Sequence, residues 1–132
     1  MTVAHDPTWQ TQVGMQGSVG LWRASVARAL DALDERLARD RAVDEGPAGA
    51  FLDAVTREPS LANETKRLVV DRARLTERVR RLRLYVAQVA GDPRQVPPVT
   101  EELAALAAAE ERCRRRSRAV FWDSFTRDIG GE

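Results

Sequence analysis

Apolar side chains recur along the second half of the chain at intervals of three, four or seven residues, and many residues between them are arginine or acidic. One stretch contains Leu68, Leu75, Val79, Leu82, Val86 and Val89. A later stretch contains Leu103, Leu106, Cys113, Val120 and Phe121. Positions three and four apart share one face of an α-helix, so the pattern predicts amphipathic helices packed in a bundle.

The first half of the chain contains one long helical pattern. It predicts a helix from Ser18, a residue suited to the N-cap, to about Val43. Its apolar stripe consists of Trp22, Val26, Leu30, Leu33 and Leu37. Residues 1–17 show no apolar period, and we interpret them as a flexible tail.

Prolines and glycines divide the rest of the chain. Pro47 and Pro59 bracket a short predicted helix over 50–57, because proline suits a first helical turn and ends a preceding one. Its inward-facing residues are predicted to be Phe51, Leu52 and Val55. A long helix then runs from Ser60 or Leu61 to about Ala90, where Gly91, Asp92 and Pro93 follow.

Pro97 and Pro98 are expected to keep the next link extended. Thr100 is expected to cap the last helix. This helix is predicted to reach Phe125 or slightly beyond. The sequence therefore predicts an all-α fold, an up-down-up bundle of three long helices with one short inserted helix. We expect a bundle domain over 18–128 and a frayed end over 129–132.

Composition narrows the functional classes. The 132 residues carry a net charge of +1, which argues against a nucleic-acid partner. The chain shows no signal peptide and no apolar run long enough to cross a membrane, so we expect no membrane partner. A single cysteine, Cys113, fits a reducing compartment, and we expect a cytoplasmic protein.

The chain has few residues of the types that usually bind metals or act as catalytic bases and nucleophiles. His5 is the single histidine, so paired-histidine metal sites cannot be assembled, and Cys113 has no histidine to act as its base. We therefore predict no catalytic residues, no metal and no cofactor. Arg72 and Glu110 fall on apolar stripes, where a buried or edge ion pair, or an arginine whose stem lies along the stripe, explains them.

Arginines gather on two helical faces. The denser run consists of Arg112, Arg114, Arg115, Arg116 and Arg118. The other face consists of Arg74, Arg78 and Arg81. These faces are able to bind phosphate, RNA or an acidic partner helix, or to pair with acidic residues of neighbouring helices.

A wider pattern resembles a known family. It comprises Gly46-Pro47-x-Gly49-x-Phe51-Leu52, then Pro59-x-Leu61, the helix from Leu68 to Leu82, and terminal aromatics before Asp128-Ile129-Gly130-Gly131-Glu132. This resembles small actinobacterial proteins distantly similar to hemerythrin-type bundles. In that family inward histidines and acids bind two irons. Here Arg72 and Cys113 stand where histidines are expected, so the resemblance implies the scaffold without its metal-binding histidines.

The last three residues carry a shorter resemblance. Gly130-Gly131-Glu132 is similar to the end of prokaryotic ubiquitin-like modifiers, whose terminal glutamate is joined to lysines of target proteins. Those modifiers are small and acidic, whereas this chain is neutral with heptad-like patterning.

Together these features predict a non-enzymatic accessory or regulatory protein that binds another protein and is able to self-associate. We expect contact through Trp122, with Arg112, Arg115 and Arg116 around it, although burial of Trp122 against Trp22 or Phe51 is an alternative. Phe121 and Phe125 are expected to close the end of the bundle. The competing classes are a hemerythrin-like metal or oxygen-binding protein, a nucleic-acid-binding protein and a ubiquitin-like modifier.

Overall fold

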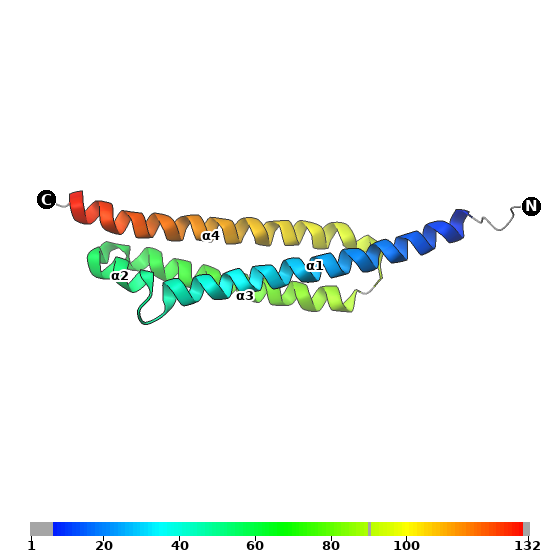
Figure 1. Ribbon diagram of the computed structural model, residues 1–132, viewed down its shortest axis with the longest axis horizontal. Helices are drawn as coiled ribbons and strands as arrows, with labels where there is room; N and C mark the ends of the chain where they lie inside the picture. The colour runs from blue at the N-terminus through cyan, green and yellow to red at the C-terminus, as the bar shows by residue number, and fades with distance from the viewer. Residues whose placement is uncertain (1–6, 90, 131–132) are drawn as a thin grey trace, which may run out of the picture.

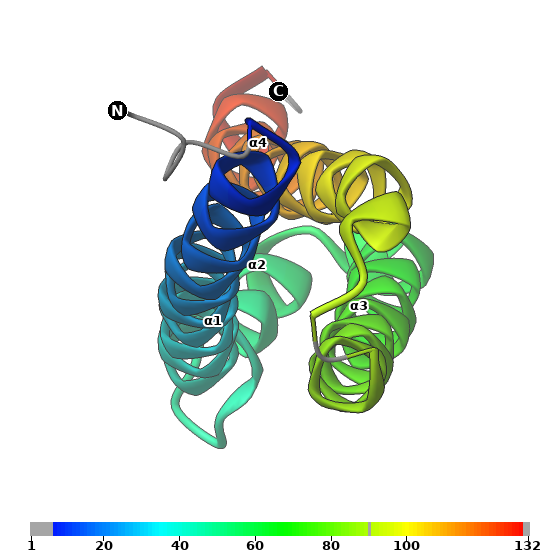
Figure 2. The ribbon, with the colours of Figure 1, turned by 90° about the vertical axis from the view of Figure 1, so that its right-hand side faces the viewer.

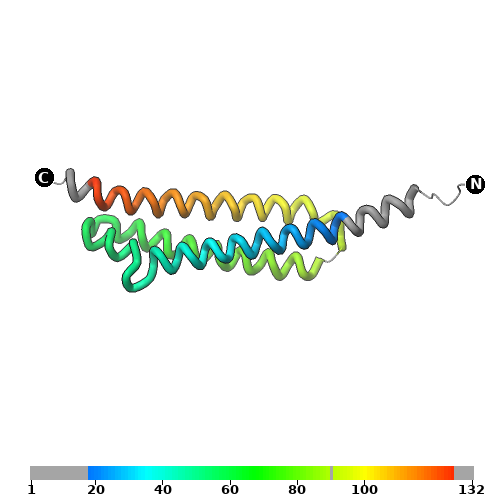
Figure 3. Tube along the Cα trace, in the orientation of Figure 1, coloured from blue at the N-terminus to red at the C-terminus, as the bar shows by residue number. Residues whose placement is uncertain are grey.

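The computed structural model describes the backbone of residues 7–89 and 91–130, and the side chains of residues 18–89 and 91–126, which are coloured in Figure 3. The elements are α1 (Pro7–Glu45), α2 (Ala50–Arg57), η1 (Pro59–Leu61), α3 (Ala62–Gln88), η2 (Pro93–Gln95) and α4 (Val96–Gly130). Over these ranges there is no strand. The predicted all-α fold of three long helices and one short inserted helix is confirmed.

The three long helices lie side by side along one axis (Figure 1), and the first of them is bent. Figure 2, which looks along that axis, shows α4 above α1 and α3, with α2 between α1 and α3 at the far end. The α1–α2 loop and the C-terminal part of α4 therefore lie at the same end of the bundle. We refer to it as the α2 end.

Two element boundaries differ from the prediction. Helix α1 begins at Pro7, so Ser18 lies inside a helix and does not cap one. Pro97 and Pro98 lie in the first turn of α4 rather than in an extended link. A first turn has no intrahelical acceptors for its backbone N–H groups, so prolines are tolerated there.

The predicted division into a tail (1–17), a bundle domain (18–128) and a frayed end (129–132) stays a prediction. The side chains of both outer segments, and the residues Gly131 and Glu132 of the Gly-Gly-Glu resemblance, lie outside the described residues.

The core has two parts. The larger one joins α1, α3 and α4 through Val26, Leu30, Leu33, Leu37, Leu75, Val79, Leu82, Val86, Val99, Leu106 and Cys113. The smaller one lies under α2 and consists of Phe51, Ala54, Leu61, Leu68 and Val120. Most of these residues belong to the stripes predicted from the sequence, which indicates that helical periodicity determined the packing faces.

Three predicted inward positions are exposed instead. Leu52 is 55% exposed because α2 buries Phe51 and Ala54, which lie three residues apart on its inner face. Phe121 and Phe125 do not close the bundle end, since both remain exposed at the flank of α4. Their rings contact each other edge to face at 5.0 Å, and the Arg57 guanidinium lies 3.9 Å from the Phe125 ring centroid.

Arginines connect the helices at the surface. Arg83 of α3 pairs with Asp31 and Asp34 of α1, and Arg78 of α3 pairs with Glu102 of α4 at 2.7 Å. Each exposed pair contributes little by itself, on the order of 0–1 kcal/mol. The sequence suggested pairing with acidic residues of neighbouring helices as one explanation of the arginine faces. These ion pairs show that it applies to some of the arginines.

Within the described ranges, no helix combines the length and apolar character that a bilayer span requires.

We predict opposite effects of alanine at two glycines. A Cβ at Gly49 would lie 2.6 Å from the Asp44 carbonyl oxygen, so Gly49→Ala should displace the α1–α2 loop and destabilise the protein by about 1–3 kcal/mol. A Cβ at Gly20 meets nothing within 4 Å, so Gly20→Ala should stabilise helix α1 by about 0.5–1 kcal/mol. Chemical denaturation measures both, and equal effects would contradict the tight approach at Gly49.

Candidate functional site

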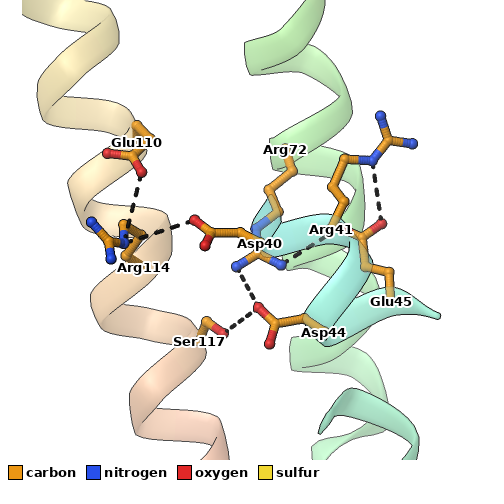
Figure 4. A network of polar contacts seen from close by, with 8 residues as sticks. All are labelled: Asp40, Arg41, Asp44, Glu45, Arg72, Glu110, Arg114 and Ser117. Atoms are coloured by element: carbon orange, nitrogen blue, oxygen red, sulfur yellow. Dashed lines mark hydrogen bonds and ion pairs between the residues drawn. The ribbon is translucent and has the colours of Figure 1, made fainter. Parts of the chain in front are cut away.

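A buried arginine joins the C-terminal end of α1 to α3 and α4. The Arg72 side chain is 1% exposed, and its Nη2 donates to Asp44 Oδ2 at 2.7 Å. The Ser117 hydroxyl of α4 donates to the same Asp44 oxygen at 2.8 Å. Figure 4 shows these groups converging from three helices. Of the alternatives expected for Arg72, which were a buried or edge ion pair and an arginine whose stem lies along the stripe, the structure shows the buried ion pair.

The surroundings of Arg72 complete this cluster. Its Nη1 faces Glu45 Oε2 at 3.5 Å, and its guanidinium lies 5.3 Å from the Phe51 ring centroid. Asp44 and Glu45 are the last residues of α1, where a helix has negative polarity, so a cation there is favourable. The cluster thus has a structural role, since it neutralises the acidic end of α1 between the two parts of the core.

Glu110 forms a weaker buried group further along α4. Its side chain is 4% exposed, and Oε1 lies 3.8 Å from both Arg36 Nε and Arg114 Nε. Arg114 Nε also lies 3.8 Å from Asp40 Oδ2 (Figure 4). These distances exceed hydrogen-bond length, so the carboxylate is held by charge rather than by direct hydrogen bonds. The ion pair expected for Glu110, buried or at the edge of the stripe, is present and its carboxylate is buried.

Across the residues with described side chains, no cluster of three or more His, Cys, Asp or Glu is placed to hold a metal ion. His5 lies outside the described residues. Arg72, which stands where the hemerythrin resemblance expects a histidine, is engaged with Asp44.

The α2 end carries two adjacent pockets that share Asp44 and Phe51. The pocket on the α3 side has a volume of about 490 Å³ and is lined by Asp44, Glu45, Gly46, Phe51, Leu52, Thr65, Lys66, Val69 and Val70. The pocket on the α4 side has a volume of about 240 Å³ and is lined by Val43, Asp44, Ala50, Phe51, Ser117, Arg118, Val120, Phe121 and Trp122.

A third concave region, which we name the arginine groove, lies between α3 and α4. Its volume is about 260 Å³, and it is lined by Asp71, Arg74, Leu75, Arg78, Ala109, Arg112, Cys113 and Arg116. The two arginine faces identified in the sequence therefore meet here. Their meeting depends on the antiparallel alignment of α3 and α4, which the sequence alone does not define.

The predicted contact residues occupy different places. Trp122 is 68% exposed and lines the α4-side pocket, so it is not buried against Trp22 or Phe51. Arg112 and Arg116 line the arginine groove, and Arg115 is exposed. Arg116 also bonds Asp71 at 2.8 Å and Glu64 at 3.2 Å on α3. A single contact centred on Trp122 with all three arginines stays a prediction.

Sequence reasoning missed the apolar pockets and Asp44. Asp44 lies seven residues after Leu37, in register with the apolar stripe of α1, but the predicted helix ended at about Val43, so this signal was not used. Searches of protein-family models, curated proteins and solved structures gave no match to this chain.

We predict that the Arg72–Asp44 pair is asymmetric in its effect on stability. Asp44→Ala should lower the free energy of unfolding by about 2–3 kcal/mol, because it leaves a fully buried guanidinium with only the more distant Glu45. Arg72→Met should cost less, since Asp44 is 13% exposed and keeps the Ser117 hydrogen bond. Urea unfolding measures both, with exposed Asp53→Ala as a control expected within about 0.5 kcal/mol of wild type. A larger loss for Arg72→Met would contradict this account.

Burial raises the pKa of the Cys113 thiol above its ordinary value of 9.0, while the nearby Arg72 and Arg116 oppose that rise. The unfolded chain therefore loses this proton at lower pH than the folded protein, so stability falls as pH rises through that ordinary value. We predict that wild type loses stability relative to Cys113→Ala between about pH 7 and about pH 10. Urea unfolding under reducing conditions measures the difference, and a difference independent of pH would contradict the raised pKa.

Proposed function

We propose that this protein is a non-enzymatic accessory or regulatory bundle that binds another protein through its α2 end. One observation carries the proposal. Of ten large apolar side chains exposed among the described residues, seven lie in or beside the two pockets: Val43, Leu52, Val69, Val70, Phe121, Trp122 and Phe125. A concentration of exposed apolar side chains at one place is typical of a protein-binding surface.

Charge around the pockets defines the partner further. The lining carboxylates of Asp44 and Glu45 are already paired with Arg72. Among the described residues, the lining cations Lys66 and Arg118 form no ion pair. A partner segment that inserts large apolar side chains and places carboxylates beside them would fill the pockets and neutralise these cations. The proposed partner is therefore a protein segment of mixed apolar and acidic character.

Trp122 is the proposed anchor of this contact. Its ring stands next to Phe121, with the ring centroids 6.5 Å apart, and its exposed face is available to a partner. Large aromatic side chains contribute disproportionately to binding when a partner desolvates them. Arg115 is a candidate for carboxylate contacts at the rim. The same proposal assigns the protein to the cytoplasm, where a free thiol such as Cys113 stays reduced.

We predict that Trp122→Ala removes partner capture. Tagged wild-type protein should retain specific proteins from a lysate of the organism that encodes it, and Trp122→Ala should lose them. With the purified partner, calorimetry should show affinity weakened by about 30-fold or more, as expected for a central aromatic anchor. Arg118→Gln should also weaken the affinity, but several-fold less than Trp122→Ala does, and mainly at low salt.

Leu84→Ala is the matched control, because Leu84 is a similarly exposed apolar residue of α3 outside both pockets. It should retain the same proteins as wild type, and circular dichroism should show all variants folded. If Trp122→Ala and Leu84→Ala retain the same set, Trp122 is not the anchor. If the captured protein is only a second copy of this chain, self-association replaces the proposed function.

A further inference from the structure

The arginine groove is lined by two pairs of arginines, one pair from each helix. Arg74 and Arg78 lie four residues apart on α3, and Arg112 and Arg116 lie four residues apart on α4. Residues at this spacing project from the same side of a helix, so each helix contributes one basic wall. Leu75, Ala109 and Cys113 form the apolar part of the lining between these walls.

Acidic residues neutralise only half of this charge. Arg78 donates through Nε and Nη2 to Glu102, while Arg116 uses Nε and Nη2 for Glu64 and Nη1 for Asp71. These bonds fix two guanidinium groups at the groove. Arg74 and Arg112, by contrast, have no ion pair or hydrogen bond among the described residues. Asp71, the single carboxylate in the lining, is occupied by Arg116.

The unpaired arginines lie on opposite walls of a groove with a partly apolar lining. Two like charges on facing helices repel each other, so the groove has a positive potential that no carboxylate of the lining neutralises at these two arginines. An anion bound between Arg74 and Arg112 would attract both guanidinium groups and so offset their mutual repulsion. Guanidinium groups also match the oxygens of a phosphate in geometry, because each presents two parallel N–H donors.

We infer that the arginine groove is a binding site for a small phosphate monoester, with the phosphate between Arg74 and Arg112 and an apolar or uncharged remainder against Leu75 and Ala109. The groove volume of about 260 Å³ lies just below the range of drug-sized ligand pockets, which suits such a molecule. The site lies on the α3 side of α4 and shares no lining residue with the pockets of the proposed function.

The test uses phenyl phosphate as the probe, titrated into the full-length protein by calorimetry at constant ionic strength. Wild type should bind it saturably and more tightly than inorganic phosphate, because the ring adds contact with the apolar lining. The double substitution Arg74→Gln/Arg112→Gln should weaken binding at least about tenfold. Both residues are exposed, so the variant should fold normally.

The matched control is Arg80→Gln/Arg115→Gln, which removes the same charge from exposed positions of the same two helices outside the groove. It should bind phenyl phosphate as wild type does.

Three outcomes would overturn the inference. Equal weakening in both double variants would mean that net charge alone attracts the anion. Absence of saturable binding to wild type would mean that the groove holds no phosphate monoester. Binding of a short single-stranded oligonucleotide, steeply weakened by salt and without saturable binding of phenyl phosphate, would assign the arginines to a nucleic-acid surface instead.

Discussion

The buried contact between Arg72 and Asp44 is the constraint on which the arrangement of this bundle depends. Arg72 lies in the α3 stripe between Leu68, which belongs to the smaller core, and Leu75, which belongs to the larger one. An unpaired buried charge costs several kcal/mol, so sliding α1 along α3 is disfavoured wherever it separates the pair. Ser117 extends the same constraint to α4. A polar layer thus sets the alignment of three helices whose apolar stripes, made mainly of leucine and valine, would tolerate other alignments.

The sequence predicted the helices well because their positions depend on local properties. Helical periodicity identified the buried faces of α1 and α3, and Pro47 and Pro59 correctly bracketed α2. The sequence-based prediction was wrong where the same residues are compatible with two local structures. Pro97 and Pro98 are compatible with an extended link or with a first helical turn, and in the structure they belong to the first turn of α4. Phe121 and Phe125 fit a helical stripe as well, but their side of α4 faces Arg57 of α2 rather than the core.

Features that depend on two distant segments were predictable only in part. Arg72 and Glu110 could be recognised as charges on apolar faces, so ion pairs were expected, yet nothing in the sequence identified Asp44 as the partner of Arg72. Likewise, the two arginine faces were visible as spacings along separate helices. Their meeting in one groove follows from the antiparallel packing of α3 and α4. The pockets at the α2 end lie where the end of α1 and helix α2 meet α3 and α4, and this meeting depends on tertiary packing rather than on any one helical period.

Helix α4 separates the two proposed surfaces. Its core-facing stripe includes Leu106, Cys113 and Val120. On the side toward α3, this stripe is flanked by Arg112 and Arg116. On the side toward α1 and α2, it is flanked by Phe121 and Trp122. Substitutions on one flank therefore leave the lining of the other unchanged. The apolar end suits a contact that releases water from aromatic surface, whereas the arginine groove suits one that neutralises charge. Because these contacts respond differently to salt, ionic strength distinguishes them in one protein without any substitution.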